Sequence, residues 1–236
     1  SKKVIQALNI TEVPSQTDLD AFLEDSPTEN SLKRRLSRLS ESQKISVDFE
    51  AVVTHELSDT INQLSSQSSC DWLVMGWDGR PTTGIFITNP IGWLLANINS
   101  NLALYRDNGV RYVGKVLLAL RPGRKDKNFI SIAKNVCDYF GGSLTLLHVV
   151  PENSSTTETV KHRSEEKLKQ SGVDAEVLIL KSSDPVETIS ETSAGYDLLI
   201  LGTPEKDNWI NVLFGGGKDK FTERAACSVL RITLKD

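Results

Sequence analysis

Hydrophobic and polar positions follow the same order twice along the chain. In the second half, short runs of adjacent apolar residues alternate with longer segments in which apolar residues recur at helical spacing. The short runs predict strands buried on both faces, and the longer segments predict amphipathic helices. The predicted strands of this half are Val116–Leu120, Leu144–Val150, Ala175–Leu180, Asp197–Leu201 and Ser228–Ile232.

Helices are predicted between these strands, and two of them carry clear end signals. Gly141-Gly142 follows the helix expected over Asn128–Phe140, as a glycine C-cap does. Asp184-Pro185-Val186-Glu187 has the form of a capping box, in which Asp184 caps free N–H groups, Pro185 takes the first helical position and Glu187 reaches back to the cap. The other predicted helices are Glu158–Gln170 and a short one near Asp219–Ala225.

The first half repeats most of this order. Ser26-Pro27-Thr28-Glu29 opens a helix by the same capping logic, with Leu32, Leu36 and Leu39 on one face. The other elements predicted here are the strands Val4–Ile10, Ile45–Val53, Asp71–Gly76 and Leu102–Tyr105 and the helices Leu57–Ser66 and Ile91–Asn99.

The second half begins with the strand Val116–Leu120 and the helix Asn128–Phe140. The first half has no counterpart of these two elements, because residue 1 lies almost at the start of Val4–Ile10, which corresponds to the second strand of the repeat. We expect another strand to lie between Val4–Ile10 and Asp71–Gly76, because unpaired backbone groups are costly to bury. Its source would be upstream residues or a neighbouring subunit or domain. Direct pairing of the two strands is the alternative.

This alternation predicts an α/β protein with two doubly wound parallel sheets in tandem, each of strand order 3-2-1-4-5. We place the first domain at residues 1–107 and the second at 108–236, with a linker at Arg106–Arg111. The last strands, Leu102–Tyr105 and Ser228–Ile232, are expected to pair or pack across a pseudo-twofold axis. Ligand clefts are expected at the carboxyl ends of the strands, where the strand order reverses.

Composition narrows the classes of partner. The 236 residues carry a formal net charge of −4, which gives no broad field to hold nucleic acid. Cys70, Cys137 and Cys227 lie far apart, so neither a disulfide framework nor a zinc site is indicated. No apolar run approaches the length of a membrane span, and no signal peptide is evident. We therefore expect a protein domain of the cytoplasm that does not bind nucleic acid.

Two segments resemble the universal stress protein family. Asp197-Leu-Leu-Ile-Leu-Gly202 and Asp71-Trp-Leu-Val-Met-Gly76 look like the strand that leads into that family's nucleotide loop, and Gly142–Val150 and Asp184–Ile189 are typical of the family. The resemblance covers most of the chain. It implies a Rossmann-like fold of the adenine nucleotide alpha hydrolase type.

In the family, the loop reads Gly, two residues, Gly, nine residues, Gly, then Ser or Thr, so that glycines let backbone N–H groups approach phosphates. The second copy keeps Gly202 and Gly215, but Glu205 and Gly216 replace the middle glycine and the hydroxyl residue. Arg121 stands where the family has an aspartate.

The first copy keeps Gly76 and Gly79 but has Asn89-Pro90 in place of Gly-Ser. Degenerate nucleotide binding is therefore assigned to Gly76 and Gly79 in this copy and to Gly202, Gly215, Gly216 and Lys218 in the second. ATP or another adenine nucleotide is the ligand such loops would take; a flexible turn before a short helix is the alternative at Gly215–Lys218.

The segment Asn9–Leu19 and the linker resemble tandem domains fused behind secondary transporters of the amino acid permease, cation–chloride cotransporter and cation/proton antiporter types. The resemblance implies a non-catalytic cytoplasmic regulatory domain whose partner is a membrane-transport domain of the same polypeptide, with a homodimer as an open alternative. A free-standing tandem stress protein that binds ATP is the alternative function. An adenine-nucleotide hydrolase is disfavoured by the altered loops.

Other candidate residues favour structural interpretations. His148 lies within a predicted strand, where a half-buried, hydrogen-bonded imidazole is expected, and His55 and His162 occupy unrelated places. Lys33-Arg34-Arg35 and Arg38 could contact lipid headgroups, but nearby carboxylates favour a mixed, solvated helix face. No residue pattern predicts a catalytic group or a metal site.

Overall fold

The computed structural model describes residues 4–19, 27–68, 70–76, 98–203 and 220–235. The chain divides into two compact units: unit 1, Ser1–Ser68, and unit 2, Ser69–Asp236. Their boundary differs from the predicted boundary between the sequence copies at 107/108. The reason is that the last two strands of the first copy are hydrogen-bonded into the sheet of the second.

In its described residues, unit 1 contains a two-stranded parallel sheet and two helices. Its elements are β1 (Val4–Glu12), α1 (Pro27–Gln43), β2 (Ser46–Thr54) and α2 (Leu57–Ser68). Helix α1 packs against β2, and α2 packs against β1. Among the described residues of this unit, Val13 and Ile61 are the buried apolar side chains, while the predicted face residue Leu39 is 47% exposed. Because two strands alone are marginally stable, this unit depends on its helices for what core it has.

The described residues of unit 2 form a seven-stranded sheet of order β3-β4-β9-β8-β5-β6-β7. Its strands are β3 (Trp72–Gly76), β4 (Asn101–Arg106), β5 (Lys115–Ala119), β6 (Ser143–Val150), β7 (Glu176–Lys181), β8 (Leu198–Gly202) and β9 (Ser228–Thr233). In the numbering of the second copy, β7-β6-β5-β8-β9 corresponds to the order 3-2-1-4-5, and each of its pairings is parallel.

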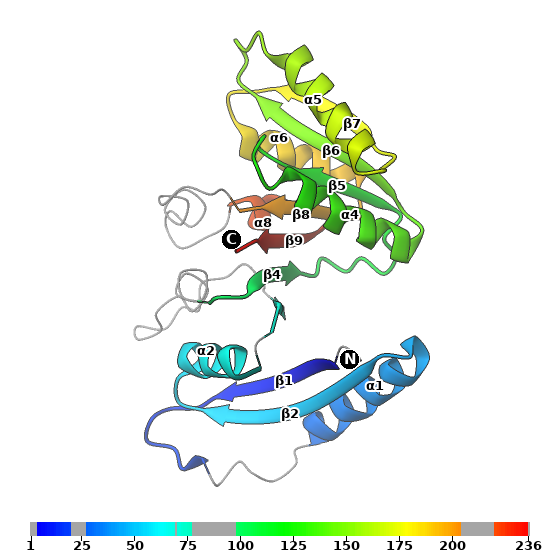
Figure 1. Cartoon of the computed structure of the whole chain (residues 1–236). Helices are drawn as coiled ribbons and strands as arrows, with labels where there is room; N and C mark the ends of the chain where they lie inside the picture. The colour runs from blue at the N-terminus through cyan, green and yellow to red at the C-terminus, as the bar shows by residue number, and fades with distance from the viewer. Residues whose placement is uncertain (1–3, 20–26, 69, 77–97, 204–219, 236) are drawn as a thin grey trace. The chain divides into compact units, whose positions relative to one another are not determined.

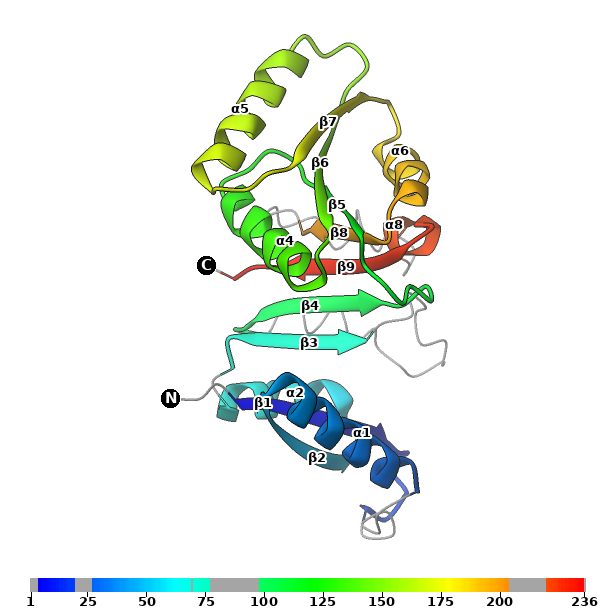
Figure 2. The same ribbon diagram turned by 90° about the vertical axis from the view of Figure 1, so that its right-hand side faces the viewer.

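Helices cover both faces of this sheet. Helices α4 (Asp126–Phe140) and α5 (Thr157–Gln170) lie on one face, and α6 (Pro185–Thr192) and α8 (Lys220–Arg224) lie on the other (Figure 2). A 3-10 turn, η2 (Ser193–Gly195), follows α6. Alternate residues of β5 enter the two cores: Val116 and Leu118 pack on the α4 side, and Leu117 and Ala119 on the α6 side. The fully buried strands explain the near-continuous apolar runs in the sequence.

The last strands of the two copies pair with each other, as predicted. β4 and β9 are antiparallel, with Leu104 opposite Arg231. The linker is fixed to the start of β9, because Asn108 Nδ2 donates to the carbonyl oxygens of Cys227, at 2.8 Å, and Ala225, at 3.2 Å. These bonds attach the linker firmly to the second copy.

The described strands of the first copy do not form one sheet. β1 pairs with β2 and β3 pairs with β4, so that among the described residues β1 and β3 are edge strands of separate sheets. No direct pairing between β1 and β3 occurs there. The expectation that a further strand lies between these segments stays a prediction.

Helix ends follow the predicted capping in part. Gly141 adopts φ = 69°, the left-handed conformation that favours glycine, and its N–H donates to the Cys137 carbonyl. The Asp184 side chain accepts from the N–H groups of Val186 and Glu187, as predicted. The predicted bond from the Asp184 N–H to the Glu187 carboxylate is wrong. Its carboxylate pairs with Arg224 at 2.8 Å, and the Asp184 N–H donates to Ser182 Oγ instead.

Candidate functional site

The candidate site lies at the carboxyl edge of the parallel strands of unit 2. β5 and β8 are neighbours there. The connection that follows β5 leads to β6 on one side of β5, whereas β8 and β9 lie on its other side. This reversal of strand order is where open α/β sheets bind their ligands. The loop from Leu120 to Lys125 follows β5, and Thr203 follows β8.

Hydrogen bonds hold three strand ends together at this edge. The Thr203 N–H donates to the Ile232 carbonyl at 2.9 Å, and the hydroxyl oxygens of Thr203 and Thr233 lie 2.8 Å apart. Lys125 Nζ donates to the Leu234 carbonyl at 2.8 Å. The β5–α4 loop and the end of β8 are therefore both tied to the end of β9.

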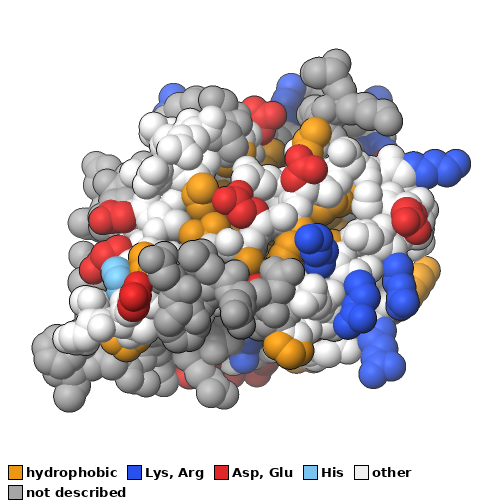
Figure 3. Space-filling model, turned by 90° about the horizontal axis from the view of Figure 1, so that it is seen from below, with side chains coloured by type: hydrophobic (Ala, Val, Ile, Leu, Met, Phe, Trp, Pro, Cys, Tyr) orange, Lys and Arg blue, Asp and Glu red, His pale blue; other side chains and the backbone are white. Residues whose placement is uncertain are grey.

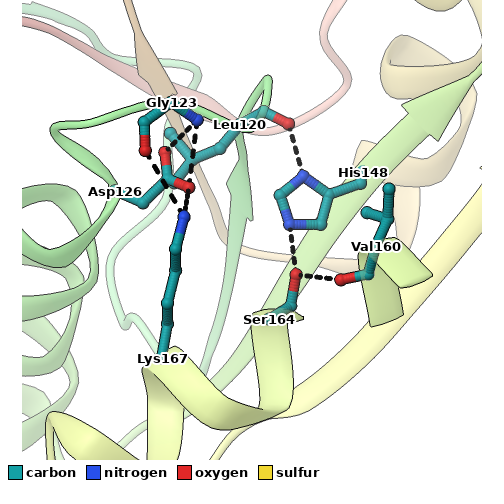
Figure 4. A network of polar contacts seen from close by, with 7 residues as sticks. All are labelled: Leu120, Gly123, Asp126, His148, Val160, Ser164 and Lys167. Atoms are coloured by element: carbon teal, nitrogen blue, oxygen red, sulfur yellow. Dashed lines mark hydrogen bonds and ion pairs between the residues drawn. The ribbon is translucent and has the colours of Figure 1, made fainter. Parts of the chain in front are cut away.

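A buried carboxylate sets the shape of the β5–α4 loop (Figure 4). Both oxygens of Asp126 accept the Gly123 N–H, at 3.0 and 3.1 Å, and Lys167 of α5 forms an ion pair with the same carboxylate. Only 7% of the Asp126 side chain is exposed. Separating this pair would leave a buried charge without its partner, which is costly. The ion pair therefore holds the loop against α5.

His148 lies beside this pair and is fully enclosed (Figure 4). Its Nδ1 lies 2.7 Å from the Leu120 carbonyl, which can only accept, and its Nε2 lies 2.9 Å from Ser164 Oγ. The side chain is 2% exposed, more deeply buried than the half-buried state predicted. Burial lowers the pKa of His148, against smaller raising effects of the Leu120 hydrogen bond and the Asp126 carboxylate; Lys167 lowers it further.

The protonation state of His148 decides where the Ser164 proton goes. In the neutral imidazole, Nδ1–H donates to Leu120 and Nε2 accepts the Ser164 hydroxyl proton. If the ring is protonated, Nε2 donates to Ser164, whose hydroxyl then donates to the Val160 carbonyl at 2.8 Å. In either state both ring nitrogens are engaged within the core. The His148 imidazole therefore has no open nitrogen to act as a general base on a substrate.

The exposed part of the site is cationic. Arg121 and Arg124 are exposed, Lys125 is half-buried and Lys127 is exposed, whereas Asp126, the acid among them, is buried and paired. Such an edge can attract an anion. It offers no free carboxylate at the end of β5.

Two of the predicted nucleotide residues can be placed. Gly202 ends β8, where a Cβ would lie 2.9 Å from Phe129 Cζ and 3.2 Å from Leu120 Cδ2, so close packing against α4 accounts for the glycine. Gly76 ends β3, and a Cβ there would meet nothing within 4 Å.

The remaining predicted positions lie outside the described residues. These are Gly79, Asn89, Pro90, Glu205, Gly215, Gly216 and Lys218. Their assignment to a nucleotide loop stays a prediction.

Sequence reasoning missed Asp126, Ser164 and Lys167. Ser164 and Leu168 are the buried residues of α5, spaced by one helical turn among charged neighbours. That spacing marks the inward face of a helix, and it was the signal available for Ser164.

The described residues contain neither a cluster of metal ligands nor a helix suited to span a membrane. Within residues 4–19, 27–68, 70–76, 98–203 and 220–235, no three His, Cys, Asp or Glu side chains gather as metal ligands would. In the same ranges, no helix combines the length and apolar character that a bilayer crossing requires.

Comparison with solved structures places the fold. A universal stress protein from Archaeoglobus fulgidus DSM 4304 superposes with a TM-score of 0.72 and 16% identity over 99% of this chain and 87% of its own. The chain has the fold of the universal stress proteins. No protein-family model matches the chain, and the comparison with curated proteins gave no match.

The universal stress protein fold also occurs in a transporter. The cytoplasmic domain of a prokaryotic cation chloride cotransporter superposes with a TM-score of 0.62 and 11% identity, covering 98% of this chain and 84% of its own. A universal stress protein in complex with cAMP matches 50% of this chain with a TM-score of 0.41.

Proposed function

We propose that this chain is a non-catalytic regulatory domain of a membrane secondary transporter, built from tandem universal stress protein-like units. The observation that carries the proposal is the chemistry of the carboxyl edge of unit 2. Its surface cations can attract an anion, while both nitrogens of His148 are engaged in the core. A site of this kind supports binding without turnover.

The transporter part of the proposal is an analogy of fold. The cotransporter cytoplasmic domain has the same fold over nearly the whole of this chain, at an identity too low to carry function by itself. The altered glycine loops of the sequence fit a domain that responds to a ligand or partner without hydrolysing it. The transport domain would belong to the same polypeptide.

A second candidate is a free-standing tandem universal stress protein that binds ATP or another adenine nucleotide. It is favoured by the higher TM-score of the Archaeoglobus fulgidus protein and by Gly202 and Gly215, which keep the loop's spacing. Packing against Phe129 explains Gly202 without a ligand, which is why this candidate ranks second.

Fractionation of the natural protein separates the two candidates. An antibody raised against this chain is used to blot membranes and supernatant of cells that carry the natural gene. The proposal predicts a band far larger than the 26.1 kDa of this chain, retained in membranes after alkaline washing. A band near that mass in the supernatant would favour the free-standing protein.

Regulation needs its own test. Solute flux is compared between the natural polypeptide and a version that lacks this domain, both reconstituted in vesicles. The proposal predicts that the two fluxes respond differently to effectors. Equal flux and equal response in both proteins would contradict a regulatory role.

A further inference from the structure

The linker between β4 and β5 contains a residue pair with covalent chemistry of its own. Asn108-Gly109 is the one Asn-Gly pair in the 236 residues. An asparagine in such a pair loses its side-chain amide readily, because glycine has no side chain to hinder attack of its nitrogen on the asparagine Cγ. Figure 1 shows the linker leaving the end of β4, and both residues of the pair are exposed to water.

Crowding does not protect the pair. Gly109 adopts φ = 84°, in the left-handed region that favours glycine. Apart from its chain neighbours, no atom lies within 4 Å of the place where a Cβ would stand on Gly109. Any protection of the pair in the folded protein must therefore come from hydrogen bonds.

Hydrogen bonds engage both groups that would react. Asn108 Nδ2, the leaving group, donates to the carbonyl oxygens of Cys227 at 2.8 Å and Ala225 at 3.2 Å. The N–H of Gly109, whose nitrogen is the nucleophile, donates to Asp107 Oδ1 at 2.8 Å. Removing that proton would create a negative charge next to the carboxylate, which disfavours it.

The same segment is anchored to the start of β9. The Asn108 N–H donates to Ser228 Oγ at 3.0 Å. Ala225, Cys227 and Ser228 are all buried, so the linker docks on a packed part of unit 2. Breaking these contacts requires a local opening of the linker.

We propose that Asn108 is a deamidation site that the docked linker holds closed, and that deamidation there prevents the linker from docking again. In the opened linker, the Gly109 nitrogen gives its proton to hydroxide and attacks Cγ of Asn108. The Cγ–Nδ2 bond breaks, and the amide nitrogen takes a proton from water and leaves as ammonia. Water then opens the resulting cyclic imide to aspartate or isoaspartate. The net change converts an amide and water into a carboxylate and ammonium.

Neither product can restore the contacts of the asparagine. A carboxylate has no N–H to donate, so it would face the carbonyl oxygens of Ala225 and Cys227 as one acceptor against two others. In isoaspartate the main chain is also one carbon longer, which displaces Gly109 from Asp107. Deamidation therefore turns a reversible opening of the linker into a permanent one.

Deamidation rates in the folded and the unfolded chain test the closed site. This test is independent of the proposed function, because it uses the 236-residue chain alone. The chain is incubated in alkaline buffer with or without guanidinium chloride, and trypsin, which cuts after Arg106 and Arg111, then releases the peptide 107–111. Mass spectrometry detects the exchange of NH₂ for OH, and a zero-time sample corrects for the digestion. We expect a rate at least about tenfold lower in the folded chain, because the contacts must break first.

The charge of the intact protein gives a second readout. Acidic and basic side chains are interspersed on the face that Figure 3 shows, and the formal net charge is only −4. Deamidation adds one carboxylate, so the modified protein should separate from the unmodified protein on isoelectric focusing.

Removing the carboxylate beside Gly109 supplies the decisive variant. Asp107→Ala should speed deamidation of Asn108 in the folded chain about tenfold, because the Gly109 N–H loses a charged acceptor. In guanidinium chloride the variant and the unaltered chain should react at similar rates, since this contact is absent from the unfolded chain. Asn153, which is exposed and precedes Ser154, is the matched control within the same digests and should react equally in both folded proteins.

Asn108→Asp reproduces one product and tests its consequence. In brief trypsin treatment of the folded protein, we expect this variant to be cut after Arg111 faster than the unaltered chain, because its linker is detached. Asn153→Asp adds the same charge at an exposed position and should be cut after Arg111 like the unaltered chain.

Four results would overturn the proposal. Two concern the unaltered chain: equal rates with and without guanidinium chloride, or no deamidation of Asn108 in either buffer. The third is an unchanged rate in folded Asp107→Ala, and the fourth is equal cleavage of the Asn108→Asp and Asn153→Asp variants. Circular dichroism checks that each variant is folded. If Asp107→Ala does not fold, the comparison of the unaltered chain in the two buffers still decides whether docking closes the site.

Discussion

Replacing Ser164 by alanine tests the buried network of unit 2 directly. The hydroxyl lies 2.9 Å from Nε2 of His148, and both side chains are nearly inaccessible, with 4% and 2% exposed. Without it, a buried ring nitrogen loses its partner, which costs about 1–3 kcal/mol. Alanine recovers about 0.5 kcal/mol through its higher helix propensity. We therefore expect a net loss of about 0.5–2.5 kcal/mol in the free energy of unfolding of unit 2.

The matched control is Ser190→Ala. Ser190 is also a buried helical serine, 7% exposed, and its hydroxyl donates to the carbonyl four residues earlier at 2.7 Å, but no imidazole contacts it. Its loss should be smaller, because no ring nitrogen is left without a partner. Urea unfolding is followed by tryptophan fluorescence, since all four tryptophans lie in unit 2. Equal destabilisation by the two variants would refute the reasoning.

The remaining predictions concern pH, a close backbone approach and a helix cap. Because burial lowers the pKa of His148 in the folded protein, the unfolded chain binds more protons below about pH 6.5, and stability should fall as the pH falls through that range; His148→Gln should flatten this dependence in pH-resolved urea titrations. Gly142→Ala should cost about 1–3 kcal/mol in urea unfolding, because a Cβ would lie 2.9 Å from a backbone carbonyl oxygen, that of Val113; Gly195→Ala, with nothing within 4 Å, is the control, and equal losses would contradict the packing argument. Asp184→Ala should lower the melting temperature, because the loss of the cap costs about 1 kcal/mol of stability, whereas Asp184→Asn should retain most of that stability. If both variants melted at the temperature of the unaltered protein, the cap would contribute no stability.

Local signals in the sequence predicted much of unit 2. The glycine C-cap at Gly141 and the aspartate N-cap at Asp184 both depend on residues a few positions apart, and both occur as predicted. The predicted bond from Glu187 to the Asp184 N–H was wrong because the Glu187 carboxylate pairs instead with Arg224, which lies far along the chain. A local pattern could not reveal that competitor.

The sequence did not predict the contacts of the site either, because they join residues that lie far apart along the chain. His148 meets Leu120 and Ser164 across 28 and 16 residues, and Asp126 meets Lys167 across 41. Each pair joins different elements of the fold, so only the packing of α4 and α5 on the sheet brings them together. Likewise, the leucine spacing of α1 predicted a helix, yet Leu39 stays exposed because the two-stranded sheet beneath is too small to cover it.

Assaying ATP binding and turnover on the same preparation tests the central claim most directly. Glu205 and Gly216 replace loop residues and Arg121 stands where the family has an aspartate, so we predict weak or undetectable binding by calorimetry. Because both nitrogens of His148 are engaged in the core, we also predict no sustained phosphate release. Micromolar or tighter affinity, with phosphate release that survives repurification and disappears in Gly215→Asp, would contradict the claim that this domain is non-catalytic.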